Sequence, residues 1–149
     1  MKENILNKLK EEHRQVLDLL KKISTSKELT RKKELFQEVH EALMSHMIGE
    51  EETLYAHLKK DAHEIAAEEV ALEAENEHNE IRDILERLND LGVDSISFDE
   101  EIQTLQRAVS DHILEEESDL FTEAKDDFSL TELQDFADEF EEAKTHHHP

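Results

Sequence analysis

The sequence predicts an all-α fold: an up-down-up-down antiparallel four-helix bundle with a short additional C-terminal helix. The 149 residues include only two glycines and one proline, so almost nothing in the chain interrupts a helix. No stretch alternates apolar and polar residues for long enough to indicate a strand. Apolar residues recur instead at steps of three and four along four long segments, which is typical of helices that bury one face.

The first helix is expected over residues 2–24 and the second over about residues 30–60. The polar segment Ser24-Thr25-Ser26 ends the first of them. Its inner stripe is continuous once one histidine is counted with the apolar residues, giving Leu6, Leu9, His13, Val16, Leu20 and Ile23. The inner stripe of the second helix includes Val39, Leu43, His46, Glu50, Leu54 and His57.

The third helix is expected over about residues 62–91, and Gly92 is a suitable residue to follow its last turn. Ser97-Phe98-Asp99-Glu100 has the spacing of a capping box and is expected to open the fourth helix. A second box, Ser129-Leu130-Thr131-Glu132, opens the fifth, whose apolar side carries Leu130, Leu133, Phe136, Ala137 and Phe140. We therefore expect a bundle over residues 1–126, an amphipathic helix packed on it over 127–145, and a tail at 146–149.

The charge of the chain excludes several classes of partner. Its 40 acidic and 17 basic residues give a net charge of −23, which argues against binding to nucleic acid or to an anionic membrane. The absence of cysteine excludes disulfides and thiolate metal sites. The segment Met1-Lys2-Glu3-Asn4-Ile5 lacks the apolar run of a signal peptide, and no apolar run has membrane-spanning length. We therefore expect a cytoplasmic protein.

Polar residues interrupt the inner stripes of all four long helices. Each helix places one histidine on its inner face, and two helices add a glutamate one turn later on that face. These residues are His13, His46, Glu50, His78, His112 and Glu116. Each histidine lies roughly 14–17 residues from the nearest turns, or about 21–26 Å along its helix, so antiparallel helices would bring all four to one central layer.

Six buried ligands of this kind indicate a metal centre. Burial without partners would cost several kcal/mol for each charged group, and a cation supplies the missing partner. Six nitrogen and carboxylate ligands are too many for one tetrahedral zinc and fit two ions, with two histidines on each and two bridging glutamates. Iron, manganese and zinc all suit such ligands. The alternative is a set of unrelated histidines, each with its own partner, because one His-x-x-x-Glu spacing alone is common in a glutamate-rich chain.

At these positions the sequence resembles the hemerythrin, or HHE cation-binding, family. The resemblance spans about residues 8–125 and rests on the segments Glu12-His13-Arg14, His46-Met47-Ile48-Gly49-Glu50-Glu51-Glu52-Thr53-Leu54-Tyr55, His78-Asn79-Glu80-Ile81 and His112-Ile113-Leu114-Glu115-Glu116-Glu117-Ser118-Asp119-Leu120-Phe121. It implies a non-haem di-iron centre with carboxylate and oxo or hydroxo bridges that binds dioxygen or a related small diatomic ligand. By this resemblance His13 and His46 would bind one iron, His78 and His112 the other, and Glu50 and Glu116 would bridge them.

One position departs from the oxygen-carrying members of the family. They usually have another histidine one turn before the ligand on the third helix, where this chain has Ala74. Both irons would then keep an open position, which permits chemistry other than reversible oxygen carriage. Glu51, Glu75 or Glu77 could fill a gap, although we expect all three at the surface. His57 continues the inner stripe two turns beyond Glu50 and is the best additional candidate ligand, although a half-buried position near the bundle end is favoured. We expect His40 and His63 to face solvent, and Tyr55 and Phe121 to pack beside the site.

Three functions fit these expectations. The leading hypothesis is a ligand-binding module, and not an enzyme, for oxygen binding, sensing or storage. The second is an iron or redox sensor or an iron-donating repair protein, in which the C-terminal helix moves or binds a partner. The third is a ferritin-like di-iron oxidase. The sequence argues against the third, because that class uses two Glu-x-x-His motifs and only Glu75-Asn76-Glu77-His78 has this spacing.

Overall fold

The computed structural model describes residues 2–61 and 64–146, and these are mostly helical. The elements are α1 (Ile5–Thr25), α2 (Leu29–Glu52), α3 (Leu54–Lys60), α4 (Ile65–Asp90), α5 (Ile96–Glu115), the π-helix η1 (Glu116–Leu120), α6 (Phe121–Asp127) and α7 (Leu130–His146). No strand occurs within the described ranges. The predicted all-α class is confirmed.

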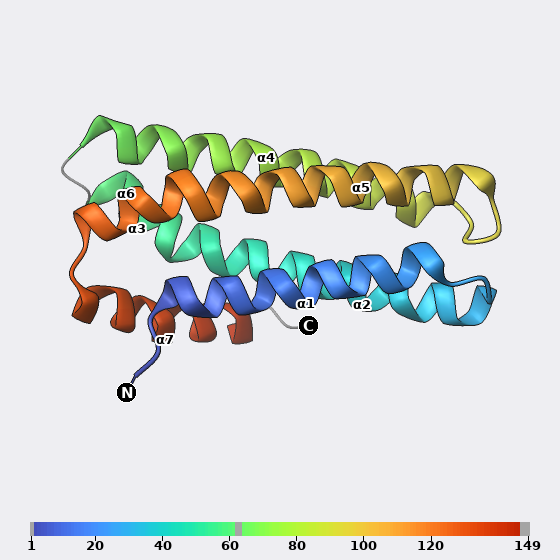
Figure 1. Cartoon of the computed structure of the whole chain (residues 1–149), viewed down its shortest axis with the longest axis horizontal. Coiled ribbons are helices and arrows are strands. Elements are labelled where there is room, and N and C mark those ends of the chain that lie inside the picture. Colours follow the sequence, from blue (N-terminus) through green and yellow to red (C-terminus); the bar gives the residue numbers. More distant parts are fainter. Residues whose placement is uncertain (1, 62–63, 147–149) are drawn as a thin grey trace.

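The long elements form an antiparallel bundle (Figure 1). In Figure 1, α2 and α3 follow one another as one rod, and so do α5, η1 and α6. In this bundle α1 lies beside α2 and α5, and α4 lies beside α3 and α5. This is the predicted up-down-up-down arrangement. No helix in residues 2–61 and 64–146 is both long and apolar enough to cross a membrane.

Two of the four predicted long helices change their geometry near the middle of the bundle. The second is broken at Thr53, where the backbone leaves the helical region (φ −119°, ψ −88°) and the side-chain hydroxyl donates to the Gly49 carbonyl at 2.6 Å. The fourth continues through a π-helical turn, which begins at Glu116. π-Turns are rare and occur often at functional sites. Both irregularities lie within three residues of a predicted glutamate ligand.

The helix caps confirm one expectation and correct another. At α7 the predicted capping box is present: Ser129 N–H donates to Glu132 Oε1 at 2.9 Å, and Glu132 N–H donates to Ser129 Oγ at 3.1 Å. The predicted capping box for the fourth helix at Ser97 is wrong. The cap is Ser95, whose Oγ accepts from Phe98 N–H at 3.0 Å. Because α5 begins directly after Ser95, the Phe98 side chain is fully buried in the core and Ser97 is exposed.

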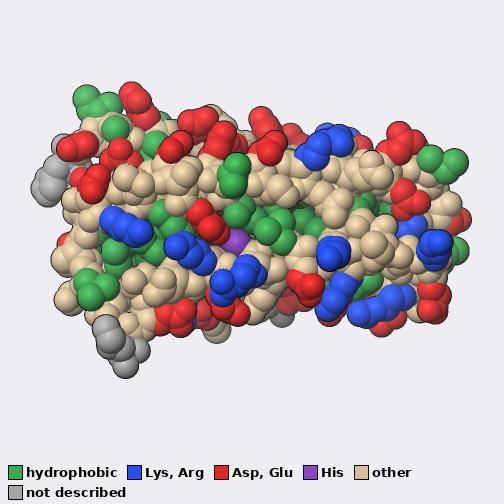
Figure 2. Space-filling model, viewed as in Figure 1, with side chains coloured by type: hydrophobic (Ala, Val, Ile, Leu, Met, Phe, Trp, Pro, Cys, Tyr) green, Lys and Arg blue, Asp and Glu red, His purple; other side chains and the backbone are tan. Residues whose placement is uncertain are grey.

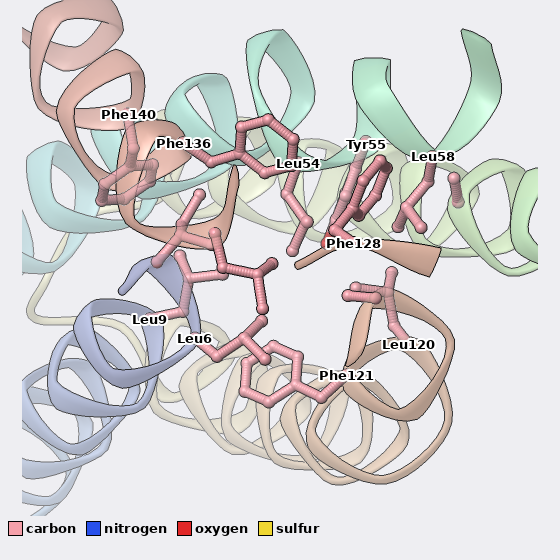
Figure 3. Close-up of a cluster of buried hydrophobic side chains, with 14 of the residues drawn as sticks. Leu6, Leu9, Leu54, Tyr55, Leu58, Leu120, Phe121, Phe128, Phe136 and Phe140 are labelled. Carbon is pink, nitrogen blue, oxygen red and sulfur yellow. The ribbon is translucent and has the colours of Figure 1, made fainter. Parts of the chain in front are cut away.

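The apolar core forms two clusters at opposite ends of the bundle. One lies near the α1–α2 and α4–α5 turns and includes Leu20, Leu35, Leu85, Phe98 and Leu105. The other lies where α3, α6 and α7 meet α1, and Figure 3 shows its leucines and aromatic rings pointing toward one another. The polar residues predicted for the inner stripes belong to neither cluster.

α7 packs along α1 and α2 on the flank of the bundle, as Figure 1 shows. Phe140 is fully buried there, and a Cβ atom added to Gly49 of α2 would lie only 2.5 Å from its ring. Gly49 therefore allows this close approach. Leu130 was expected on the apolar side of α7 but is 55% exposed at the first residue of that helix.

Candidate metal centre

The six polar residues of the inner stripes lie together at one level of the bundle. Each is between 0% and 5% exposed. The helices that carry them contact one another around the bundle, so the side chains converge from four directions. They are His13 of α1, His46 and Glu50 of α2, His78 of α4, His112 of α5 and Glu116 of η1.

The histidines form two pairs. The ring centroids of His13 and His46 are 4.8 Å apart, and those of His78 and His112 are 4.7 Å apart. Each pair forms a four-residue group with Glu50 and Glu116, and within each group the candidate ligand atoms all lie within 4.8 Å of one another. The two groups therefore share both glutamates.

Each glutamate lies between histidines of different pairs. Glu50 Oε1 is 3.1 Å from Nε2 of both His46 and His78. Glu116 Oε1 is 3.1 Å from His13 Nε2, and its Oε2 is 3.4 Å from His112 Nε2. A carboxylate in this position can bridge two cations, one on each side.

Several buried atoms of this centre have no hydrogen-bond partner. Among the described residues they include Nε2 of His13 and His46, both carboxylate oxygens of Glu50, and Oε1 of Glu116. Buried polar atoms without partners are rare, because each costs the free energy of its lost hydration. Metal cations would satisfy all of them, so the residues fit the predicted pair of ions.

Each histidine ring is hydrogen-bonded by a glutamate on the side that faces away from the centre, which we call its outer glutamate. Nδ1 of every ring faces a carboxylate oxygen of a neighbouring helix, which leaves Nε2 directed inward. The pairs and their distances are His13–Glu117 (2.7 Å), His46–Glu12 (2.9 Å), His78–Glu51 (2.6 Å) and His112–Glu77 (2.7 Å). Carboxylates in such pairs fix the tautomer and the orientation of the ring and increase its basicity as a ligand.

The four outer pairs close a ring around the bundle. Each outer glutamate is the chain neighbour of an inner residue on its own helix, as Glu12 is of His13 and Glu51 is of Glu50. The pairs link α1 to α2, α2 to α4, α4 to α5, and η1 back to α1. Every helix of the bundle thus contributes both an inner ligand and the support for the ligand of the next helix.

Tyr55 places its hydroxyl inside the centre. The side chain is fully buried, donates a hydrogen bond to Glu116 Oε2, and lies 3.2 Å from His78 Nε2. Its ring packs at 5.1 Å from the ring of His78. The break at Thr53 precedes this residue by two positions and starts the helix that carries it.

The sequence of this chain matches the hemerythrin HHE cation-binding domain over residues 4–124. The chain belongs to the hemerythrin HHE cation-binding domain family. The predicted resemblance is confirmed. The described His and Glu groups are the part of this family member that fits such a role.

Two comparisons place this family member among known proteins. A protein of Nostoc sp. named "DNA nickase" is 26% identical over 142 residues, or 95% of this chain. The chain spans only 39% of the length of that protein. The crystal structure of a hemerythrin HHE cation-binding domain-containing protein from Mycobacterium kansasii matches with a TM-score of 0.84 at 23% identity, over 97% of this chain and 86% of that one. The second likeness supports the fold.

Burial and neighbouring charges shift the pKa values of the inner residues of this hemerythrin-family chain. Burial, and then repulsion from Glu116, raises the pKa of Glu50 to about 8. Burial alone would raise the pKa of Glu116, but its interactions with Glu50, His112 and His13 outweigh burial and hold that pKa well below its usual range. Burial lowers the pKa of His112, but hydrogen bonds with Glu116 and Glu77 outweigh it and raise the pKa to about 11. The centre is therefore built to hold positive charge.

The other residues considered from the sequence lie outside the inner group. His57 is half-buried, as expected; it hydrogen-bonds Asp61 and Glu139 and stacks on Phe136 of α7 at 3.9 Å, so it serves the contact with that helix. His40 is half-buried beside Phe36, not fully exposed as predicted. His63 lies outside the described residues. Phe121 packs against the ring of His13 at 6.4 Å.

Three expectations about glutamates and one about tyrosine need correction. Glu51 and Glu77, expected at the surface, are half-buried and hold His78 and His112. Glu75 is also half-buried, and it pairs with Lys59 at 2.9 Å. Tyr55, expected only to pack beside the site, reaches into it. The sequence does contain a signal for the outer glutamates, because each one is the direct chain neighbour of an inner residue. Glutamate is so abundant in this chain that such neighbours also occur by chance, and the signal is therefore weak.

Proposed function

We propose that this chain holds two iron ions at this centre and binds dioxygen or a related small diatomic ligand there. The single observation that supports this most strongly is that Glu50 and Glu116 are shared between two histidine pairs. The proposed ligands are His13 and His46 for one ion and His78 and His112 for the other, with both glutamates as bridges. Iron bound in this way would supply the electron density that holds a diatomic ligand; manganese and zinc are the alternative ions.

A small cavity lies beside the proposed ligands. It has a volume of about 10 Å³ and borders all four histidines together with apolar side chains that include Val16, Leu43, Met47 and Val109. A cavity of this size is at the lower limit for one water molecule, so it does not by itself select a diatomic ligand. The protein thus contributes a dry surface beside the histidines, while Tyr55 and the outer glutamates keep the polar groups in fixed positions.

The nicking activity named for the Nostoc relative is not part of this proposal. The six inner residues are at most 5% exposed, so none of them can contact the backbone of a DNA strand. The net charge of −23 also opposes approach of a polyanion.

The optical spectrum of the iron-loaded chain tests this function. The protein is loaded with ferrous iron without oxygen and then exposed to air. We expect a new visible absorption band that disappears when oxygen is removed. A band that persists, with repeated consumption of oxygen, would indicate an oxidase, and a chain that takes up no iron would contradict the proposal.

A second candidate, an iron sensor, is favoured by the contacts of α7. Lys144 of α7 forms an ion pair with Glu12, the glutamate that holds His46, and Phe140 packs at 6.0 Å from the His46 ring. A change at His46 on metal binding could therefore alter how firmly α7 is held. Protease cleavage within residues 130–145, compared with and without iron, tests this candidate, and equal protection would contradict it.

A further inference from the structure

The C-terminal helix α7 is strongly acidic. It carries six acidic residues and one lysine between Leu130 and His146, in a chain whose net charge is already −23. Figure 2 shows acidic side chains along the edge of the molecule that α7 forms, with basic side chains beside them. Because like charges repel, the attachment of this helix to the bundle needs cations as well as apolar contacts. Basic side chains from the rest of the chain supply them, and the pairs include Lys2 with Asp135 and Asp138, Lys8 with Glu141, and His57 with Glu139.

His57 of α3 differs from the two lysines because both of its ring nitrogens face carboxylates. Nδ1 lies 2.7 Å from Oδ2 of Asp61, the residue that ends α3, and Nε2 lies 3.0 Å from Oε1 of Glu139 on α7. A neutral imidazole has one N–H group and can donate to only one of these acids, whereas the imidazolium donates to both. The geometry therefore fits a ring that carries a positive charge.

The surroundings of His57 favour that charge. Among the described residues, the charged groups in contact with the ring are Asp61 on its own element and Glu139 on α7. The other contacts are aromatic: Phe136 of α7 stacks on the ring at 3.9 Å, and Phe128, which follows α6, meets it edge-on at 6.2 Å. Burial lowers the pKa of His57, but hydrogen bonds with Glu139 and Asp61 outweigh burial and raise that pKa above its ordinary value of 6.5.

Protonation of His57 and attachment of α7 are therefore linked. A detached α7 takes Glu139 and Phe136 away from the ring, so the pKa of His57 is lower in the detached state than in the attached one. The proton then favours attachment fully below the pKa of the detached state, and this contribution is lost as the pH rises through the pKa of the attached state. Lys2 and Lys8 stay charged throughout this range, so their ion pairs do not change.

We propose that His57 is a pH-sensitive clamp on α7. As an imidazolium it joins α3 to α7 through Asp61 and Glu139, and its deprotonation loosens the helix. The consequence reaches the metal centre, because α7 covers the His46 side of it, where the Phe140 ring packs at 6.0 Å from the His46 ring. The clamp itself consists of residues outside the inner group, so it does not depend on the proposed function.

Chymotrypsin cleavage of the metal-free full chain tests the clamp. Phe136 and Phe140 are at most 5% exposed, so cleavage after them requires α7 to leave the bundle. Cleavage after Phe98, in the apolar cluster at the opposite end, reports unfolding of the whole bundle instead. Each rate is divided by that of an unstructured peptide with the same cleavage site, which removes the pH dependence of the protease. We expect cleavage of α7 to become about two- to fivefold faster from pH 6 to pH 9, as for the loss of one ion pair at a surface.

Glu139→Gln and Asp138→Asn form a matched pair, because each removes one negative charge from adjacent positions of α7. Glu139→Gln should be cleaved faster than the wild type at pH 6 and show little further increase at pH 9. Asp138→Asn loses the ion pair with Lys2, so it should be cleaved faster at both pH values and keep the wild-type increase. A pH effect that originates at the metal centre is common to all three chains and does not distinguish them. Equal increases in Glu139→Gln and the wild type, or no increase in the wild type, would overturn the clamp.

The titration of the ring gives a second readout. The Cε1 proton of His57, assigned with the variant His57→Gln, is followed by NMR in the full chain between pH 5 and pH 9. We expect a pKa above 6.5 that falls in Glu139→Gln and stays unchanged in Asp138→Asn. A wild-type pKa at or below 6.5 would overturn the clamp, and it would leave the proposed metal binding unaffected.

Discussion

Glu50 and Glu116 show how single residues make this centre suitable for cations. Two carboxylates buried among four imidazoles cannot both stay ionised without added positive charge, and in the metal-free chain that charge comes from protons. The outer glutamates complete the arrangement. Burial raises the pKa of Glu12, Glu51 and Glu77, but hydrogen bonds, foremost from their histidines, outweigh it and lower each pKa, so these carboxylates stay charged.

The outer glutamates are expected to set affinity without setting the number of ions. Replacement of Glu12 by Gln removes the charge that holds His46 Nδ1, so metal affinity should fall about 10- to 100-fold while two ions still bind at saturation. Glu11→Gln is the matched control, because Glu11 is exposed next to Glu12 and pairs with Arg14 on the same helix. Competition with a metal chelator measures both affinities, and equal values would contradict the role given to Glu12.

Tyr55 is expected to stabilise the metal-free centre. Tyr55→Phe keeps the ring against His78 but removes the hydrogen bond to Glu116, which leaves a second buried oxygen of that carboxylate without its donor. The free energy of unfolding of the metal-free chain should fall by about 1–3 kcal/mol. Chemical denaturation measures the change, and an unaltered stability would show that the hydroxyl has no such role.

At the scale of the elements, the helical pattern could be predicted and its interruptions could not. The stripe through His46, Glu50 and His57 indicates one continuous helix, because residues 51–60 contain no glycine or proline. The break depends on the Thr53 hydroxyl bonding Gly49, and the π-turn at Glu116 depends on packing against the other helices. The N-cap of α5 was also ambiguous in the sequence, because Ser95 and Ser97 can both act as caps. The burial of Phe98 favours Ser95.

The packing of α7 against α2 depends on Gly49, which has no side chain beyond its hydrogen atom. Gly49→Ala would place a methyl group 2.5 Å from the Phe140 ring, which is fully buried and cannot move aside. We expect a loss of about 1–3 kcal/mol in stability and faster proteolysis within residues 130–145. Gly92→Ala is the control, because its methyl group would meet only the flexible side chain of Asp94. Similar behaviour of both variants would argue against this packing.

For the whole molecule, the fold and the inner site could be predicted because both follow from the same periodicity. His13, His78 and the two His-x-x-x-Glu pairs occupy core positions at one depth, and only a closed bundle brings them together. The ring of outer glutamates could not be predicted, since a chain with 40 acidic residues offers many candidates and only the packing selects Glu12, Glu51, Glu77 and Glu117.

Stability of the metal-free chain is expected to fall as the pH rises from 6 to 8. The pKa of Glu50 is raised to about 8 in the folded chain, so its proton favours folding below the ordinary value of 4.5, and this contribution is lost as the pH rises through 8. Glutamates whose pKa is lowered by folding lose their contribution to stability only at acidic pH, which lies outside the window from pH 6 to 8. Denaturation of the metal-free chain and of Glu50→Gln measures the slope, which the variant should flatten. Parallel curves would contradict this assignment.

Anomalous diffraction at the iron absorption edge, from crystals of the chain loaded with ferrous iron, tests the central claim most directly. We expect two peaks at mid-height in the bundle, one beside Nε2 of His13 and His46 and the other beside Nε2 of His78 and His112, with Glu50 and Glu116 between them. A single peak, or no peak among these six residues in a chain supplied with excess iron, would contradict the account.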